Sequence, residues 1–186
     1  MTAATATKPA ISLKLQQGSL GLRLAAVVAG TAILTLSSWI EVPMIPVPMT
    51  MQTFAVTLIG ALYGWRLGAA TVAAWLVEGA MGMPVFAGGA GGLPVFAGPT
   101  AGYLLSFPIS AGLVGWLVER RWNGSRLVLA FAAMLLGNAV SLALGAEWLA
   151  VFAGAEKALV LGVAPFALGA VVKSALGAAT LKALTR

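Results

Sequence analysis

A succession of long apolar stretches is the feature that most limits what this chain can fold into. They occupy most of residues 20–184 and are separated by short segments that contain prolines, glycines or charged residues. A helix that crosses a bilayer needs about 20 mainly apolar residues, and 60% of the 186 residues are hydrophobic while 9% are charged. We therefore predict an all-α integral membrane protein with six transmembrane helices, comprising a cytoplasmic tail at 1–19 and a single membrane domain at 20–186.

Residues that interrupt a helix set the expected boundaries. Three prolines between 43 and 48 lack backbone donors and end the first span, and a tight turn at 65–66 separates the second span from the third. Pro108 predicts a kink, and the stretch 147–162 is amphipathic enough to include a short surface helix. The six predicted spans are 20–40, 50–63, 67–83, 100–118, 127–144 and 164–184.

A segment rich in glycine and proline separates the third span from the fourth. It contains Pro-Val-Phe-Ala-Gly twice, at 84–88 and 94–98, on either side of the run 88–92. Here neither helix nor regular strand is favoured, and glycine lets the backbone approach a ligand closely. Irregular backbone beside a membrane needs protein or a water-filled cavity around it. We therefore predict a binding site at this loop, which includes Gly91 and Gly92.

The basic residues predict the orientation of the chain, because cytoplasmic loops carry an excess of lysine and arginine. With a cytoplasmic N-terminus, the outer loops receive only Lys157, and the glycine-rich segment lies outside. Membrane topology thus explains the net charge of +6 without nucleic acid. We expect both termini on the cytoplasmic side of the cell membrane. The inner side receives Lys8, Lys14, Arg23, Arg66, Arg120, Arg121, Arg126, Lys182 and Arg186.

Lys173 is the sharpest single-residue signal, because it lies about nine residues into the last span, or roughly 14 Å along a helix. A lysine near the bilayer middle is unfavourable by about 2.5–3.5 kcal/mol, so it should face the bundle interior and meet a partner or an anionic ligand. Snorkelling to the inner interface is the alternative. Glu78 is its candidate counter-charge, although an interfacial carboxylate in water explains Glu78 as well.

Four further side chains are candidates for ligand binding. Asn138 lies mid-span, where its amide needs another helix or a polar ligand. Gln52 follows the proline-rich segment and either caps freed backbone groups or contacts an amide-like edge of a ligand. Phe86 and Tyr103 are suited to wall an apolar pocket, but aromatic residues at a membrane interface usually need no ligand to explain them.

Small residues recur every four positions in the first span, as Ala25 with Ala29 and Ala26 with Gly30. Such faces let helices approach closely. By default they pack inside the bundle, and alternatively they dock another membrane subunit.

The residue inventory argues against an enzyme. The chain contains no Cys and no His, and its five acids are all glutamates, so thiolate or imidazole metal sites and His-dependent catalysis are excluded. The glycines are not followed by Lys-Ser or Lys-Thr at the spacing of a phosphate loop. We expect no cofactor, no metal and no nucleotide site.

Five motifs in order along the chain resemble the BioY family, the biotin-binding S components of energy-coupling factor transporters. The motifs are VPMTMQTF at 47–54, GMPVFAGGAGG at 82–92, GPTAGYL at 98–104, GAEWL at 145–149, and GVAPF at 162–166 leading to Lys173. The resemblance covers about residues 20–184.

The resemblance implies a six-helix substrate-binding subunit for biotin, whose pocket opens outward and includes Lys173. It also implies three partner subunits, a transmembrane T component and two ATPases, with the first helix meeting the T component at Ala25 and Ala29. The family usually has Asp three residues before the lysine, where this chain has Ala170 and no Asp anywhere. Two alternative functions remain: an S component that binds another small vitamin, or a self-sufficient oligomeric transporter of small molecules.

Overall fold

The structure, a computed structural model, describes residues 15–184. Most of the predicted tail, including Lys8 and Lys14, and the C-terminal Arg186 therefore lie outside the described residues. In chain order the elements are α2 (Leu20–Trp39), β1 (Glu41–Val42), β2 (Met49–Thr50), α3 (Gln52–Ala80), η1 (Ala87–Gly89), η2 (Leu93–Ala97), α4 (Ala101–Glu119), α5 (Leu127–Ala153), α6 (Ala155–Gly162) and α7 (Ala164–Leu184).

Helix α3 consists of two helices that fold back on each other at Gly64. That glycine has a φ of 80°, in the left-handed region that other residues disfavour. A Cβ placed on Gly68 would lie 3.0 Å from the Cα of Gly60, whereas eight residues along a continuous helix would separate them by about 12 Å. With α3 counted as two, the helices α2, α3, α4, α5 and α7 supply six apolar helices. The predicted six-helix membrane fold is confirmed.

Helix α5 is longer than predicted. The sequence suggested an end at Leu144, before Gly145 and Glu147, but α5 continues to Ala153 and stops at Gly154, which has a φ of 84°. Gly145 is required for packing instead, because a Cβ there would clash with the ring of Tyr103. The expected surface helix is the shorter α6.

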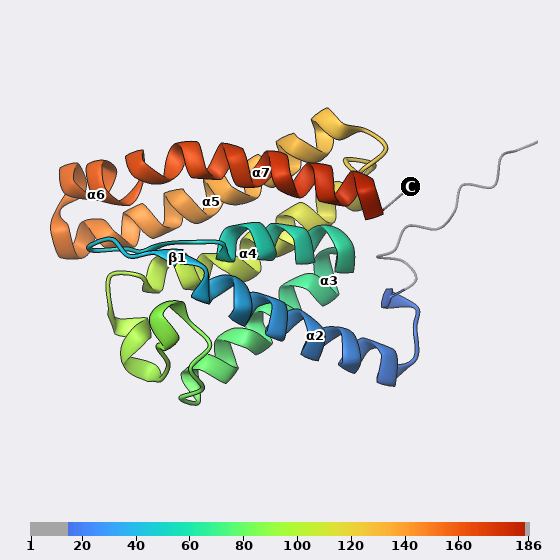
Figure 1. Ribbon diagram of the computed structural model, residues 1–186, viewed down its shortest axis with the longest axis horizontal. Helices are drawn as coiled ribbons and strands as arrows, with labels where there is room; N and C mark the ends of the chain where they lie inside the picture. The colour runs from blue at the N-terminus through green and yellow to red at the C-terminus, as the bar shows by residue number, and fades with distance from the viewer. Residues whose placement is uncertain (1–14, 185–186) are drawn as a thin grey trace, which may run out of the picture.

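The proline-rich segment after α2 forms a small antiparallel hairpin. Glu41 pairs with Thr50, and Val42 pairs with Met49. The sequence predicted only a break in the helix here, because two-residue strands carry no periodic signal. The hairpin leads directly into the first turn of α3 and is drawn between α7 and α2 in Figure 1.

The glycine-rich segment is held by the end of α2. The Ser38 hydroxyl donates to the carbonyl oxygen of Val85 at 2.6 Å, and the Trp39 indole donates to that of Pro84 at 3.1 Å. Phe86 then packs edge-on against Trp75, with ring centroids 4.9 Å apart. This part of the loop is therefore anchored to the core.

Charged residues separate toward two ends of the bundle. Figure 1 shows the start of α2, the fold-back of α3 and the C-terminal end of α7 at one end, and the hairpin and α6 at the other. Arg23 and Arg66 belong to the first end, together with the loop that carries Arg120 and Arg121. Which end faces the cytoplasm remains a prediction from charge.

Cysteine labelling tests that orientation, because the native chain has none. Leu93, in the glycine-rich segment, is 71% exposed, so we expect Leu93→Cys to react in intact cells with a thiol reagent that does not cross the membrane. Ser125→Cys, in the exposed loop between α4 and α5, is the matched control and should react only after the membrane is opened. The reverse pattern would invert the predicted topology.

Candidate functional site

A cavity of about 240 Å³ lies where the hairpin, the glycine-rich segment and four helices meet. This volume is somewhat below the roughly 300–1,000 Å³ of typical ligand pockets, so the cavity suits a small molecule. Its lining residues are Val47, Pro48, Thr50, Gln52, Thr53, Phe86, Ala87, Ala90, Val95, Thr100, Tyr103, Leu104, Phe107, Asn138, Ser141, Leu142, Phe166, Ala170 and Lys173.

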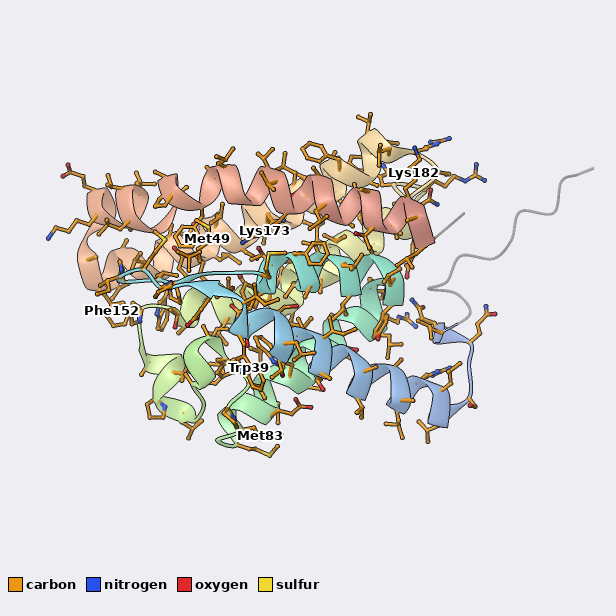
Figure 2. The ribbon with its side chains drawn as sticks, in the orientation of Figure 1. Trp39, Met49, Met83, Phe152, Lys173 and Lys182 are labelled. Carbon is orange, nitrogen blue, oxygen red and sulfur yellow. The ribbon has the colours of Figure 1, made fainter. Side chains whose placement is uncertain are left out.

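Lys173 lies inside the bundle and not at the inner interface. Its ammonium donates to the backbone oxygen of Thr50 at 2.6 Å and to the Thr53 hydroxyl at 3.4 Å. Figure 2 places the side chain between α7 and the hairpin, beside Met49. An ammonium has three donors, and these two bonds leave one donor for a ligand.

Asn138 lies at the same cavity on α5 and is 2% exposed. Its amide nitrogen donates to the backbone oxygen of Met134 at 3.0 Å and to the Ser174 hydroxyl at 3.1 Å. The second bond joins α5 to α7. Asn138 is therefore both an interhelical contact and part of the cavity wall, so it fits both of the alternatives left open by the sequence.

Gln52 begins α3 and also lines the cavity. Its side-chain oxygen accepts from the Thr50 hydroxyl at 3.0 Å. Within residues 15–184, its amide nitrogen is a buried donor that has no partner. A buried donor without a partner is unfavourable by about 1–3 kcal/mol, and an acceptor on a ligand would relieve that penalty.

The remainder of the wall is largely apolar. Phe86 contributes from the glycine-rich segment, Tyr103 and Phe107 from α4, and Phe166 from the start of α7. The Tyr103 hydroxyl donates to the carbonyl oxygen of Gly162 at 2.9 Å, so its ring is fixed while its polar end is already paired. The cavity thus combines apolar walls with a polar end formed by α3, α5 and α7.

Three predicted site residues do not line the cavity. Glu78 lies in the last turn of α3, and it is not among the lining residues of the described chain. Gly91 and Gly92 act through the backbone instead: a Cβ on Gly91 would clash with the oxygen of Met83, and the Gly92 amide donates to the Gly79 oxygen at 2.7 Å. They shape the loop that places Phe86 and Ala90 at the cavity.

Several lining residues were not singled out from the sequence. Ser141 lies three residues after Asn138, and Phe107 lies four after Tyr103, which are spacings that place side chains on one helix face. That periodicity was a usable signal. Thr50 was not recognisable, because its contribution to Lys173 is a backbone oxygen.

The small-residue face of α2 divides into two. Ala25 and Ala29 are exposed, whereas Gly30 is buried and packs so closely that a Cβ would lie 2.5 Å from the Thr71 methyl group. The oxygen of Ala26 accepts from the Tyr63 hydroxyl at 2.8 Å. Ala26 and Gly30 therefore face the bundle, and Ala25 and Ala29 form an outer face.

The fold and the cavity define the chain as an α-helical, multi-pass membrane protein with an internal cavity whose lining suits a small, partly polar molecule. The residues from 15 to 184 contain no group of three His, Cys, Asp or Glu side chains that could hold a metal ion.

Comparisons with known proteins agree with this class. The model of the BioY family matches residues 9–186. A probable biotin transporter BioY of Pyrococcus horikoshii is 36% identical over 144 residues, or 77% of this chain and 84% of the relative. The biotin transporter BioY of Thermotoga maritima is 36% identical over 137 residues, or 73% and 79%. The chain belongs to the BioY family.

A solved structure shows the same fold. The S component for biotin from an ECF-type ABC transporter superposes with a TM-score of 0.79 and 24% sequence identity, over 90% of this chain and 94% of that chain. Membership of a transporter family confirms two predictions: that the chain is a membrane transport protein, and that it is not an enzyme.

Proposed function

We propose that this chain binds biotin in the cavity and supplies it for uptake across the bacterial cell membrane. The observation that carries the proposal is the combination of apolar aromatic walls with the polar groups of Lys173, Asn138 and Gln52 in one small cavity. Biotin has a matching distribution, with an apolar ring and aliphatic chain between a ureido group and a carboxylate. The names of the relatives support the same ligand.

Energy for uptake would come from partner subunits, a transmembrane T component and two ATPases. This part of the proposal rests on the family and on the solved S component of an ECF-type transporter. The sequence itself contains no phosphate-loop motif. With both termini in the cytoplasm, the hairpin and the glycine-rich segment would surround an outward-facing entrance to the cavity.

Equilibrium binding to the purified full chain tests the ligand. Biotin should bind with saturable stoichiometry, and other small vitamins in a parallel panel should not compete with it. A panel in which a different vitamin binds and biotin does not would replace biotin as the ligand while retaining the site.

The exposed face of α2 predicts where the partner subunit docks. Replacing Ala25 or Ala29 with Leu should leave biotin binding within about twofold and strongly reduce energised uptake, because bulk there blocks close helix approach. Gly30→Leu is the matched control on the buried face of α2, where it should destabilise the bundle itself. Binding by purified protein and uptake by cells with the partner subunits are measured in parallel. If Ala25→Leu abolishes binding, its face belongs to the internal bundle.

A further inference from the structure

The chemistry of its partners fixes the orientation of the Asn138 amide. The Met134 backbone oxygen can only accept. The Ser174 hydroxyl donates its single proton to the Ala170 oxygen at 2.6 Å, so toward Asn138 it can only accept. Asn138 therefore directs its amino group at both partners and uses both of its N–H donors.

This arrangement leaves the side-chain oxygen of Asn138 as an acceptor. Across residues 15–184 it has no hydrogen-bond partner, and the residue is 2% exposed and lines the cavity. An amide oxygen can accept hydrogen bonds through two lone pairs, and on a cavity wall it is available to a ligand. A ligand N–H in the cavity would supply the missing donor.

Two of the surrounding polar groups have donors to spare. Gln52 has a buried amide nitrogen without a partner in the described part of the chain, and Lys173 keeps one N–H beyond its bonds to Thr50 and Thr53. Both are adjacent to Thr50, so they lie at the same end of the cavity. Asn138 lines the same cavity, and its amide nitrogen is bonded to Ser174, the residue after Lys173 on α7.

The Asn138 acceptor beside these two donors suits a neutral group that carries N–H and C=O together. A carboxylate offers only acceptors, and it would place negative charge beside the Asn138 oxygen. A cyclic urea satisfies both kinds of group at once. Ala170, which also lines the cavity, adds no hydrogen-bonding side chain.

We infer that Asn138 is a specificity-determining residue whose side-chain oxygen accepts a hydrogen bond from a ligand N–H, so that the site selects a ureido-type edge. For this chain the inference rests on biotin being the ligand. The Asn138 amide then has two functions: its nitrogen joins α5 to α7, and its oxygen recognises the ligand.

The test compares biotin with two lactam analogues in which one or the other ureido N–H is replaced by CH2. Equilibrium dissociation constants are measured on purified wild type, Asn138→Leu and Ser174→Ala. Wild type should bind one of the lactams at least tenfold more weakly than biotin. Asn138→Leu should bind biotin about tenfold more weakly or worse, and bind that lactam and biotin within about twofold of each other.

Ser174→Ala is the matched control, because it removes the same interhelical hydrogen bond but keeps the Asn138 oxygen. It should retain the wild-type discrimination between biotin and the lactam. The inference is overturned if wild type binds both lactams as well as biotin, a result that needs no variant to fold. It is also overturned if Asn138→Leu still discriminates, or if Ser174→Ala does not. Failure of wild type to bind biotin at all is a different result, which would overturn the proposed ligand as well.

Discussion

Lys173→Met should weaken biotin binding by roughly tenfold to more than a hundredfold while leaving a folded protein. Methionine keeps the length of the side chain but has no charge and no donors. The change removes the N–H that remains for a ligand beyond the bonds to Thr50 and Thr53. Hydrogen bonds to charged groups are worth about 1.5–3 kcal/mol, which gives this range of dissociation constants.

The controls for Lys173→Met separate charge at the cavity from charge elsewhere. Lys157 is exposed on α6, and Glu78 is absent from the lining residues that the structure describes. Lys157→Met and Glu78→Gln should therefore leave the dissociation constant within about twofold of wild type. The measurement is equilibrium binding on monodisperse protein, with circular dichroism to verify the helices. Unchanged affinity in Lys173→Met would show that the ligand does not contact this ammonium.

Gly60→Ala should destabilise the bundle by about 1–3 kcal/mol or more, the range for overpacking a close contact. A Cβ on Gly60 would clash with the backbone oxygen of Ala111 on α4 and would lie 2.9 Å from its carbonyl carbon. Backbone cannot rotate away as a flexible side chain can, so α3 and α4 would have to separate. For a chain of this size we expect the apparent melting temperature to fall by roughly 2–12 °C.

Gly21→Ala is the matched control for Gly60→Ala. Gly21 lies near the start of α2, and a Cβ there would meet nothing within 4 Å. Since alanine favours helix over glycine by about 0.5–1 kcal/mol, Gly21→Ala should be neutral or slightly stabilising. Thermal unfolding followed by tryptophan fluorescence in one detergent compares the two. Equal melting temperatures for wild type and Gly60→Ala would mean that the two helices do not pack as closely as described.

Glu78, in the last turn of α3, illustrates the limit of reasoning from charge alone. Sequence suggested Glu78 as a partner for Lys173 because both are ionisable and few alternatives exist in an apolar chain. The structure gives Lys173 two uncharged oxygen acceptors instead, one of them a backbone carbonyl where the hairpin ends and α3 begins. A backbone acceptor has no identity in the sequence, so it could not have been predicted.

Hydropathy, helix-breaking residues and the positions of the basic residues by themselves determined the membrane class, the six helices and the separation of charge toward two ends. These are local properties, since about 20 apolar residues or one cluster of prolines acts without reference to distant parts of the chain. The motifs likewise indicated the family. Only the tertiary structure decided which residues line the cavity, because Lys173 and Thr50 are in contact although 123 positions separate them in the sequence. It also decided which small residues of α2 face inward, because Gly30 is buried against Thr71 while Ala25 and Ala29 are exposed.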